Sequence, residues 1–128
     1  MSGSVDTVLF VEDDASIRRV GEVSLRAIGK FRVLLASNGL EALEIVERER
    51  VDVILLDVMM PELDGPGTLR RLQANDATKD IPTIFLTARV QPSELAAYLA
   101  MGALGVIRKP FDPVSLPADV RSFMTKAR

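Results

Sequence analysis

The stretch Val53-Ile54-Leu55-Leu56-Asp57-Val58-Met59-Met60-Pro61 decides the fold of this chain. A continuous apolar run of this length, closed by a proline, is typical of a strand buried on both faces of a parallel sheet. A carboxylate inside such a strand would be costly to desolvate, so we expect Asp57 where the strand emerges, at the carboxyl edge of the sheet. The alternative is that Asp57 only caps the following turn, and this stretch alone does not decide between the two.

Four further apolar runs of strand length occur along the chain, and segments with helical spacing of apolar residues separate them. The additional expected strands are Thr7–Val11, Phe31–Ala36, Ile81–Leu86 and Leu104–Ile107. The first expected helix begins near Ala15 behind the N-cap Asp14, ends at Gly29 and carries apolar residues at Ile17, Val20, Val23, Leu25 and Ile28. The others follow Asn38, the turn 61–67, Gln91 and Pro113. This alternation predicts an α/β fold with a doubly wound, five-stranded parallel sheet and helices on both faces.

The composition narrows the possible functions. The chain has 128 residues, which predicts a single domain over residues 1–128 with residues 1–6 as a flexible lead-in. It has no Cys and no His, which excludes disulfides, thiolate chemistry, an imidazole base and the usual zinc and copper sites. A net charge of -2 does not provide the basic field that binds a nucleic acid backbone. Because no leader or membrane-spanning run is present, we expect a cytoplasmic protein.

Polar residues stand at the carboxyl ends of four expected strands. Glu12 and Asp13 follow the first strand, Asp57 ends the third, Thr87 follows the fourth and Lys109 the fifth. Each alone has an ordinary explanation as a cap, strand or surface residue. Together they meet at one sheet edge, where three carboxylates would repel one another unless a cation compensates them, and all-oxygen ligands suit Mg²⁺.

The same edge has groups that suit a phosphoryl group. Lys109 offers a positive charge and Thr87 a hydroxyl donor for phosphate oxygens. Since His and Cys are absent, Asp57 is the available carboxylate nucleophile, and attack by it would yield an aspartyl phosphate.

This set of residues resembles the receiver domain of two-component response regulators, from about Thr7 to the end of the chain. The resemblance rests on Glu12-Asp13, Asp57, Met60-Pro61 with Asp64-Gly65, Thr87-Ala88 and Lys109-Pro110-Phe111, in this order and at these spacings. It implies a flavodoxin-like, CheY-like receiver fold with strand order 2-1-3-4-5. It also implies that Asp57 accepts a phosphoryl group from a phosphohistidine on a sensor histidine kinase or a histidine phosphotransfer protein.

The resemblance further implies roles for single residues. Asp13, the Asp57 carboxylate and the Met59 backbone carbonyl would bind Mg²⁺, with Glu12 acting through water. Lys109, Thr87 and Ala88 would hold the phosphoryl group, and the Lys109–Pro110 peptide bond would be cis.

One position of this sequence differs from the usual family pattern, and two further positions can tune the site. The family usually has an aromatic residue where Val106 stands, so this chain has no ring at that position for a switch that couples Thr87 to an aromatic rotamer. Met59 and Arg89 stand at positions that vary in the family, and we predict that their bulk shields the phosphoryl group from attacking water.

The resemblance places the signalling surface on the helix–strand–helix face that follows Thr87, over about residues 91–126. Leu95, Tyr98 and Leu99 are candidate contacts for a downstream protein or a second copy, although an apolar helix stripe can equally be core. Neither nucleic acid nor a membrane is an expected direct partner. A phosphorelay shuttle, a receiver piece of a longer regulator and an adaptor that is never phosphorylated stay open as alternatives.

Two other classes of protein on similar sheets fit less well. Phosphohydrolases with an aspartate nucleophile carry a second acid two residues later, where this chain has Met59. A flavodoxin-type nucleotide or flavin site would need a phosphate-binding loop after the first strand, where Glu12-Asp13-Asp14 would repel phosphate. We therefore expect a signalling domain that is no enzyme beyond its own phosphorylation and dephosphorylation.

Overall fold

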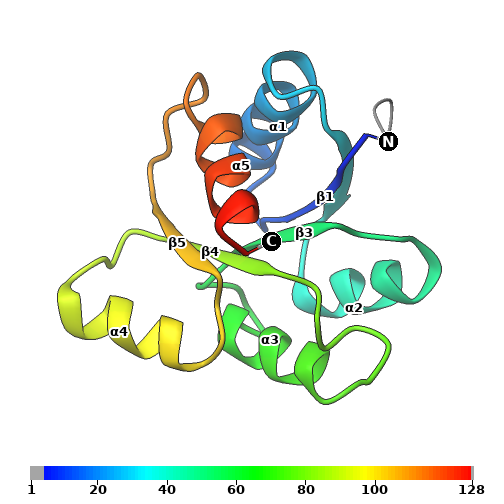
Figure 1. Ribbon diagram of the computed structural model, residues 1–128, viewed down its shortest axis with the longest axis vertical. Helices are drawn as coiled ribbons and strands as arrows, with labels where there is room; N and C mark the ends of the chain where they lie inside the picture. The colour runs from blue at the N-terminus through cyan, green and yellow to red at the C-terminus, as the bar shows by residue number, and fades with distance from the viewer. Residues whose placement is uncertain (1–4, 128) are drawn as a thin grey trace.

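The computed structural model describes residues 5–127 and contains one five-stranded sheet with helices on both faces (Figure 1). The strands are β1 (Thr7–Val11), β2 (Arg32–Ala36), β3 (Val53–Asp57), β4 (Thr83–Thr87) and β5 (Gly105–Arg108). The helices are α1 (Ala15–Val23), continued by the π-helical segment η1 (Ser24–Ile28), then α2 (Gly39–Arg48), α3 (Gly65–Gln73), α4 (Pro92–Ala100) and α5 (Leu116–Ala127). Of the predicted lead-in 1–6, residues 1–4 lie outside the described residues.

All neighbouring strands of the sheet are parallel, and their order is β2-β1-β3-β4-β5. The predicted fold class is confirmed, including the strand order that the resemblance implied. Strand boundaries differ by one or two residues from the expected ones: β4 begins at Thr83, after Pro82, which has no backbone N–H to donate to a ladder.

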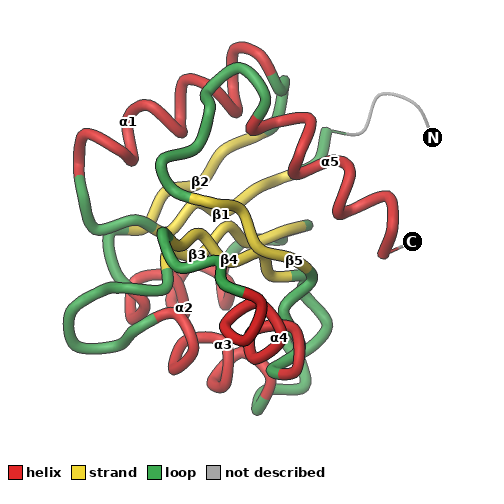
Figure 2. Tube along the Cα trace, turned by 90° about the vertical axis from the view of Figure 1, so that its left-hand side faces the viewer, coloured by secondary structure: helices red, strands yellow, loops and turns green. Residues whose placement is uncertain are grey.

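The sheet lies between two helical layers, and each layer covers a separate core. Figures 1 and 2 show α1 and α5 on one face and α2, α3 and α4 on the other. The α1/α5 core contains Phe10, Leu55, Leu86 and Ile107, and the α2/α3/α4 core contains Leu56 and Phe85 among its buried side chains. Successive residues of β3 and β4 thus alternate between the cores, as expected for strands buried on both faces.

Only part of the apolar pattern of α1 faces the sheet. Val20 and Val23 are 45% and 49% exposed, whereas Gly21 is buried. The reason is a close approach: a Cβ at Gly21 would collide with the Phe10 ring, so the helix packs on β1 through a residue without a side chain. The following segment η1 then turns Leu25 fully into the α1/α5 core.

Three of the helices begin at the carboxyl edge of the sheet with a side-chain cap. Asp14 accepts a hydrogen bond from the Ile17 N–H, Asn38 from Glu41 and Asp64 from Gly67, at 3.0, 2.8 and 2.7 Å. These caps satisfy free N–H groups at the helix starts and fix the strand-to-helix loops around that edge. None of the helices within residues 5–127 has the length and apolar character needed to cross a bilayer.

Candidate functional site

The pleat of the strands brings three charged side chains to one place. Residues two apart in a strand share a face, and Phe10, Leu55 and Ile107 all point into the α1/α5 core. Glu12, Asp57 and Lys109 each follow one of these residues by two positions, at the ends of β1, β3 and β5. The backbone keeps its pairing past the strand ends, since the Glu12 N–H donates to Ala36 and the Lys109 N–H to Thr87.

Lys109 connects the two buried carboxylates. Its Nζ lies 2.8 Å from Glu12 Oε1 and 3.3 Å from Asp57 Oδ1. Glu12 is 1% exposed and Asp57 3% exposed, so these ion pairs are largely removed from water. The second oxygen of Glu12, Oε2, accepts the Asp14 N–H at 3.1 Å, and Asp57 Oδ1 accepts the Met59 N–H at 3.3 Å. Asp57 therefore both caps the turn after β3 and belongs to a charged cluster, so the two interpretations of its position hold together.

Burial and charge act on the pKa values in opposite directions. Burial, and then the neighbouring charge of Glu12, raise the pKa of Asp57 from 3.8 to about 6, although Lys109 opposes them. Burial alone would lower the pKa of Lys109, but its hydrogen bond to Glu12 and the charge of Asp57 raise it. At neutral pH the cluster accordingly contains an ionised Asp57 beside a charged ammonium group.

The acidic groups have the spacing of a metal site. Carboxylate oxygens of Glu12, Asp13 and Asp57 lie within 4.8 Å of one another. Two of these residues are buried, while Asp13 is exposed and opens the cluster to solvent. Hard oxygen ligands and a partly open position fit Mg²⁺, which keeps some of its water ligands. The predicted role of the Met59 carbonyl stays a prediction.

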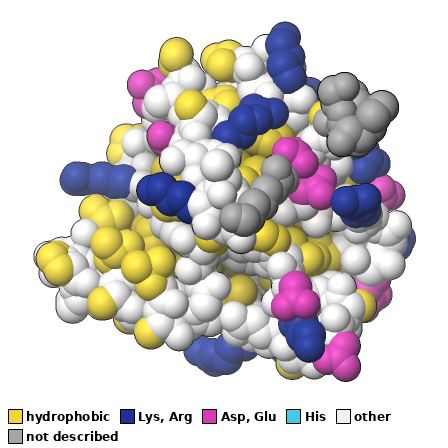
Figure 3. Space-filling model, viewed as in Figure 1, with side chains coloured by type: hydrophobic (Ala, Val, Ile, Leu, Met, Phe, Trp, Pro, Cys, Tyr) yellow, Lys and Arg dark blue, Asp and Glu magenta, His cyan; other side chains and the backbone are white. Residues whose placement is uncertain are grey.

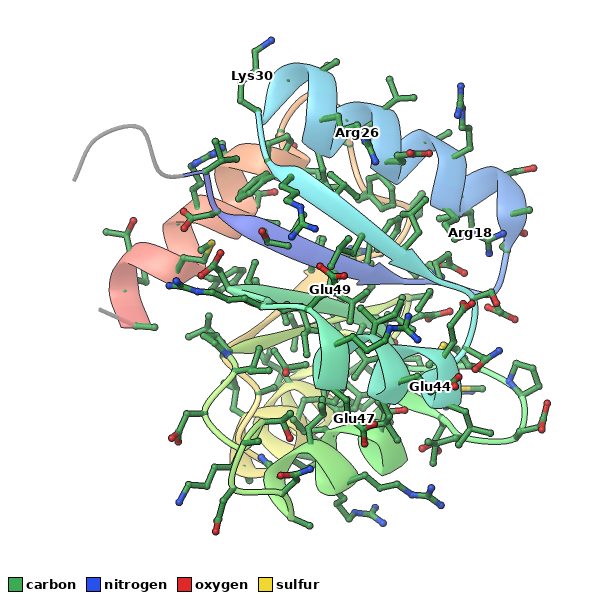
Figure 4. The ribbon with its side chains drawn as sticks, turned by 90° about the vertical axis from the view of Figure 1, so that its right-hand side faces the viewer. Arg18, Arg26, Lys30, Glu44, Glu47 and Glu49 are labelled. Carbon is green, nitrogen blue, oxygen red and sulfur yellow. The ribbon has the colours of Figure 1, made fainter. Side chains whose placement is uncertain are left out.

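Arg18 is a site neighbour that the sequence interpretation missed. Its Nη1 donates to the Glu12 carbonyl at 2.7 Å, and Figure 4 shows it at the start of α1, beside the carboxyl ends of the strands. It holds the end of β1 and places a positive charge next to the acids. An arginine one turn into a helix that follows three acids was the available signal.

Thr87 lies near the cluster but on the other face of the sheet. It follows Phe85 of the α2/α3/α4 core by two residues, is 2% exposed, and its Oγ1 accepts the Arg89 N–H at 3.0 Å. Ala88 and Arg89 are exposed in the loop that follows. The Lys109–Pro110 peptide bond is cis, as the resemblance implied.

At Val106, β5 has no aromatic side chain, but α4 contributes an aromatic ring to the same core. Val106 is partly buried against the α2/α3/α4 core, and Tyr98 of α4 packs edge-on against Phe85 with ring centroids 5.2 Å apart. Tyr98 is therefore partly a core residue rather than a free surface group.

Helix α4 is the least buried helix of the described chain, since none of its residues is fully buried. Leu95 is 37% and Leu99 45% exposed, and Met101 behind the helix is 36% exposed. Figure 3 shows hydrophobic side chains gathered over α4, with Lys and Arg side chains beside them near β5. Of the predicted contact residues, Leu95 and Leu99 are thus on the surface.

Comparison with known proteins gives a consistent result for most of the chain. The model of the response regulator receiver domain family matches residues 8–121. The chain is 41% identical over 127 residues to the probable transcriptional regulator ycf27 of Porphyra purpurea, covering 99% of this chain and 51% of that protein. It is 40% identical over 121 residues to the response regulator MprA of Mycobacterium leprae, covering 94% and 52%. The chain therefore spans about half the length of the curated relatives it matches.

Solved structures agree with this match. The chemotaxis response regulator CheY4 of Vibrio cholerae superimposes with a TM-score of 0.87 at 32% identity, covering 94% of this chain and 99% of that chain. The receiver domain of the sensor histidine kinase PA1611 of Pseudomonas aeruginosa superimposes with a TM-score of 0.83 at 31% identity, covering 95% and 99%. In that protein a magnesium ion is coordinated in the active-site cleft.

Proposed function

Since the chain belongs to the response regulator receiver domain family, we propose that it is a phosphoacceptor of a two-component pathway and that Asp57 is the residue phosphorylated. The observation that carries this proposal is the pair of contacts by which Lys109 connects Asp57 and Glu12 at the carboxyl edge of the sheet. A carboxylate with a pKa of about 6 is ionised at neutral pH, so it is available as a nucleophile.

The proposed reaction is a phosphoryl transfer without redox chemistry. An oxygen of the Asp57 carboxylate forms a bond to the phosphorus atom of the donor. The bond from phosphorus to the imidazole nitrogen of a phosphohistidine breaks, and that nitrogen keeps the electron pair. The product is an acyl phosphate on Asp57, and later attack by water releases inorganic phosphate and restores the carboxylate.

The chain's own residues bind and orient the reacting groups. Mg²⁺ held by Glu12, Asp13 and Asp57 would neutralise charge that develops on the phosphoryl oxygens. Lys109 lies 3.3 Å from Asp57 and would stay beside the phosphoryl group as a fixed positive charge. Thr87 ends β4 and Ala88 follows it, and the Thr87 hydroxyl and the Ala88 N–H would donate to phosphoryl oxygens.

We assign the output signal to protein contacts made by the face of α4, β5 and α5. The described helices and strands would act together as one receiver domain. Its support is the exposed apolar surface of Leu95 and Leu99 on α4. The donor would be a sensor histidine kinase or a histidine phosphotransfer protein, and the recipient a downstream protein or a second copy of the chain. The shuttle, the receiver piece of a longer regulator and the unphosphorylated adaptor are the alternatives.

The test of the phosphoacceptor is intact mass after incubation with acetyl phosphate and Mg²⁺. Wild type should gain the mass of one phosphoryl group, and Asp57→Ala or omission of Mg²⁺ should prevent the gain. A folded, Mg²⁺-binding wild type without the adduct would instead favour the adaptor. For the output face, a Leu99→Ala variant should lose partner capture, and undiminished capture would remove this helix from the interface.

A further inference from the structure

Arg108 is an exposed residue at the end of β5, directly before Lys109. Among the described residues its guanidinium group has no hydrogen bond or ion pair, while the neighbouring Lys109 is bound to two carboxylates. Arg108 therefore has, next to the site, a positive charge that pairs with no carboxylate of the described residues. Such a group can form new contacts when the charge of the site changes.

The strand register places Arg108 next to Thr87. The two residues are paired between β4 and β5, and both lie on the face of the sheet that α4 covers, since Thr87 follows Phe85 and Arg108 follows Val106 by two positions. Val106 is partly buried against the core on this face, whereas the long side chain of Arg108 is exposed and has no partner among the described residues that fixes its direction.

Two surface grooves meet at Arg108. The first, which we call the Thr87 groove, has a volume of about 520 Å³ and is lined by Ala88, Arg89, Val90, Gln91, Glu94 and Arg108. The second, the α5 groove, has a volume of about 250 Å³, and its lining includes Arg108, Asp119, Phe123 and Lys126. Figure 1 shows β5 at the edge of the sheet, where α4 and α5 flank it. Arg108 can therefore turn into either groove without displacing a core side chain.

The lining of each groove contains one acidic residue, whose carboxylate has a single negative charge. Glu94 lies in the Thr87 groove and Asp119 in the α5 groove. A phosphoryl group on Asp57 adds a charge of about −1.5 to −2 and three acceptor oxygens, and guanidinium groups bind such oxygens in bidentate form. Asp57 ends β3 and Arg108 ends β5, two strands away, roughly 10 Å at the strand spacing of a sheet. Asp57 points to the α1/α5 face and Arg108 to the opposite face, so the guanidinium group would approach a phosphoryl group past the end of β4.

We propose that Arg108 is a positioning residue that turns from the α5 groove toward the phosphoryl group on Asp57 and so couples the site to α5. This inference rests on the proposed function of Asp57. In the unphosphorylated protein Arg108 and Asp119 line the same groove without forming an ion pair. After phosphorylation the stronger charge draws it over Thr87, which leaves Asp119 without this cation and changes the charge of the α5 groove.

The coupling has a structural rationale in this particular chain. Val106 has no ring that could rotate with Thr87, so a swinging aromatic is absent from β5. Arg108 lies one pleat further along the same face and carries a charge that responds to the phosphoryl group directly. The signal would then reach α5 through electrostatics rather than through a packed ring.

The experiment compares wild type with Arg108→Gln, Arg108→Lys and Arg71→Gln. Arg71 is an exposed arginine of α3, and its variant controls for the loss of one surface charge. Each protein is treated with acetyl phosphate and Mg²⁺. Intact mass gives the amount and lifetime of the adduct, and hydrogen exchange of the β5 and α5 amides reports the change on phosphorylation.

We expect Arg108→Gln to form the adduct, to lose it faster than wild type, and to show less than half of the wild-type exchange change in α5. Arg108→Lys should recover part of the exchange change, and Arg71→Gln should behave as wild type. If Arg108→Gln keeps either the wild-type lifetime or the wild-type α5 change, this inference is wrong while the proposed function stands. If the wild type forms no adduct, the proposed function fails first and the inference with it.

Discussion

At the residue scale, Asp57 is a carboxylate that the fold buries beside a second carboxylate. Burial and the charge of Glu12 raise its pKa to about 6, and Lys109 compensates only in part. Such an arrangement destabilises the folded protein when no metal is bound, because the unfolded chain ionises Asp57 more easily. Function and stability are therefore in conflict at this one side chain.

The first prediction concerns this conflict. Without Mg²⁺, the free energy of unfolding should fall as the pH rises from about 4 to about 6, because in this window the folded protein binds more protons than the unfolded chain. The contribution of Asp57 is at most about 3 kcal/mol, and it is constant above the folded pKa. Asp57→Asn should lack this fall and be more stable than wild type at pH 8. Urea unfolding at pH 4 and pH 8 checks this, and equal pH dependence of the two proteins would contradict it.

The second prediction concerns the lifetime of the phosphoryl group. Met59 is 69% exposed beside Asp57, and Arg89 is exposed beyond Thr87, so both can cover the path of attacking water. We expect Met59→Asn and Arg89→Ala each to speed loss of the phosphoryl group up to about tenfold, a barrier change of about 1.4 kcal/mol. The decay of the adduct in Mg²⁺ buffer measures this. Unchanged or slower decay in both variants would rule out shielding.

The position of the main charged residues could be predicted because it follows from simple periodicity. Parallel strands end at one edge, and the period of two puts Glu12, Asp57 and Lys109 on one face. The hydrogen bond from Arg18 to the Glu12 carbonyl could not, because it depends on where α1 begins. Sequence patterns leave such boundaries open by one or two residues.

At the element scale, α1 shows how packing overrides an apolar pattern. Its valines at positions 20 and 23 look like a core stripe, yet the helix turns Gly21 toward Phe10 and leaves both valines on the surface. The π-helical turn of η1 then shifts the register, which brings Leu25 into the core. Sequence spacing alone contains no signal for that shift, since it assumes a regular helix.

The third prediction follows from this register. Leu25→Ala removes a side chain with no exposed surface and should lower the free energy of unfolding by about 2–5 kcal/mol. Val23→Ala, on the same helix and 49% exposed, should change it by no more than about 0.5 kcal/mol. Urea unfolding of both variants provides the comparison. A larger loss for Val23→Ala than for Leu25→Ala would show that α1 packs with the face that its apolar spacing suggests.

At the scale of the whole molecule, three carboxylates from two strand ends meet only because the complete sheet is assembled. Glu12 and Asp13 are separated from Asp57 by more than forty positions in the chain, so the unfolded protein has no such cluster. A cation that binds this cluster binds the folded state alone, and its binding free energy adds to the stability of the entire domain.

The fourth prediction uses that linkage. At a Mg²⁺ concentration of about 100 times the dissociation constant, the free energy of unfolding should rise by about 2.7 kcal/mol, and a chelator should reverse the gain. Asp13→Asn removes one exposed ligand and should require a higher Mg²⁺ concentration for the same gain. Asp76→Asn is the matched control, because this fully exposed aspartate lies in the loop before β4 and pairs only with Lys79 among the described residues. Equal stabilisation of Asp13→Asn and wild type, or the same gain from NaCl at equal ionic strength, would mean that Mg²⁺ acts by general screening. A gain specific to Mg²⁺ and to Asp13 would instead place the cation among the three acids, where it compensates both the burial of the Asp57 carboxylate and its repulsion by Glu12, the two causes of its raised pKa.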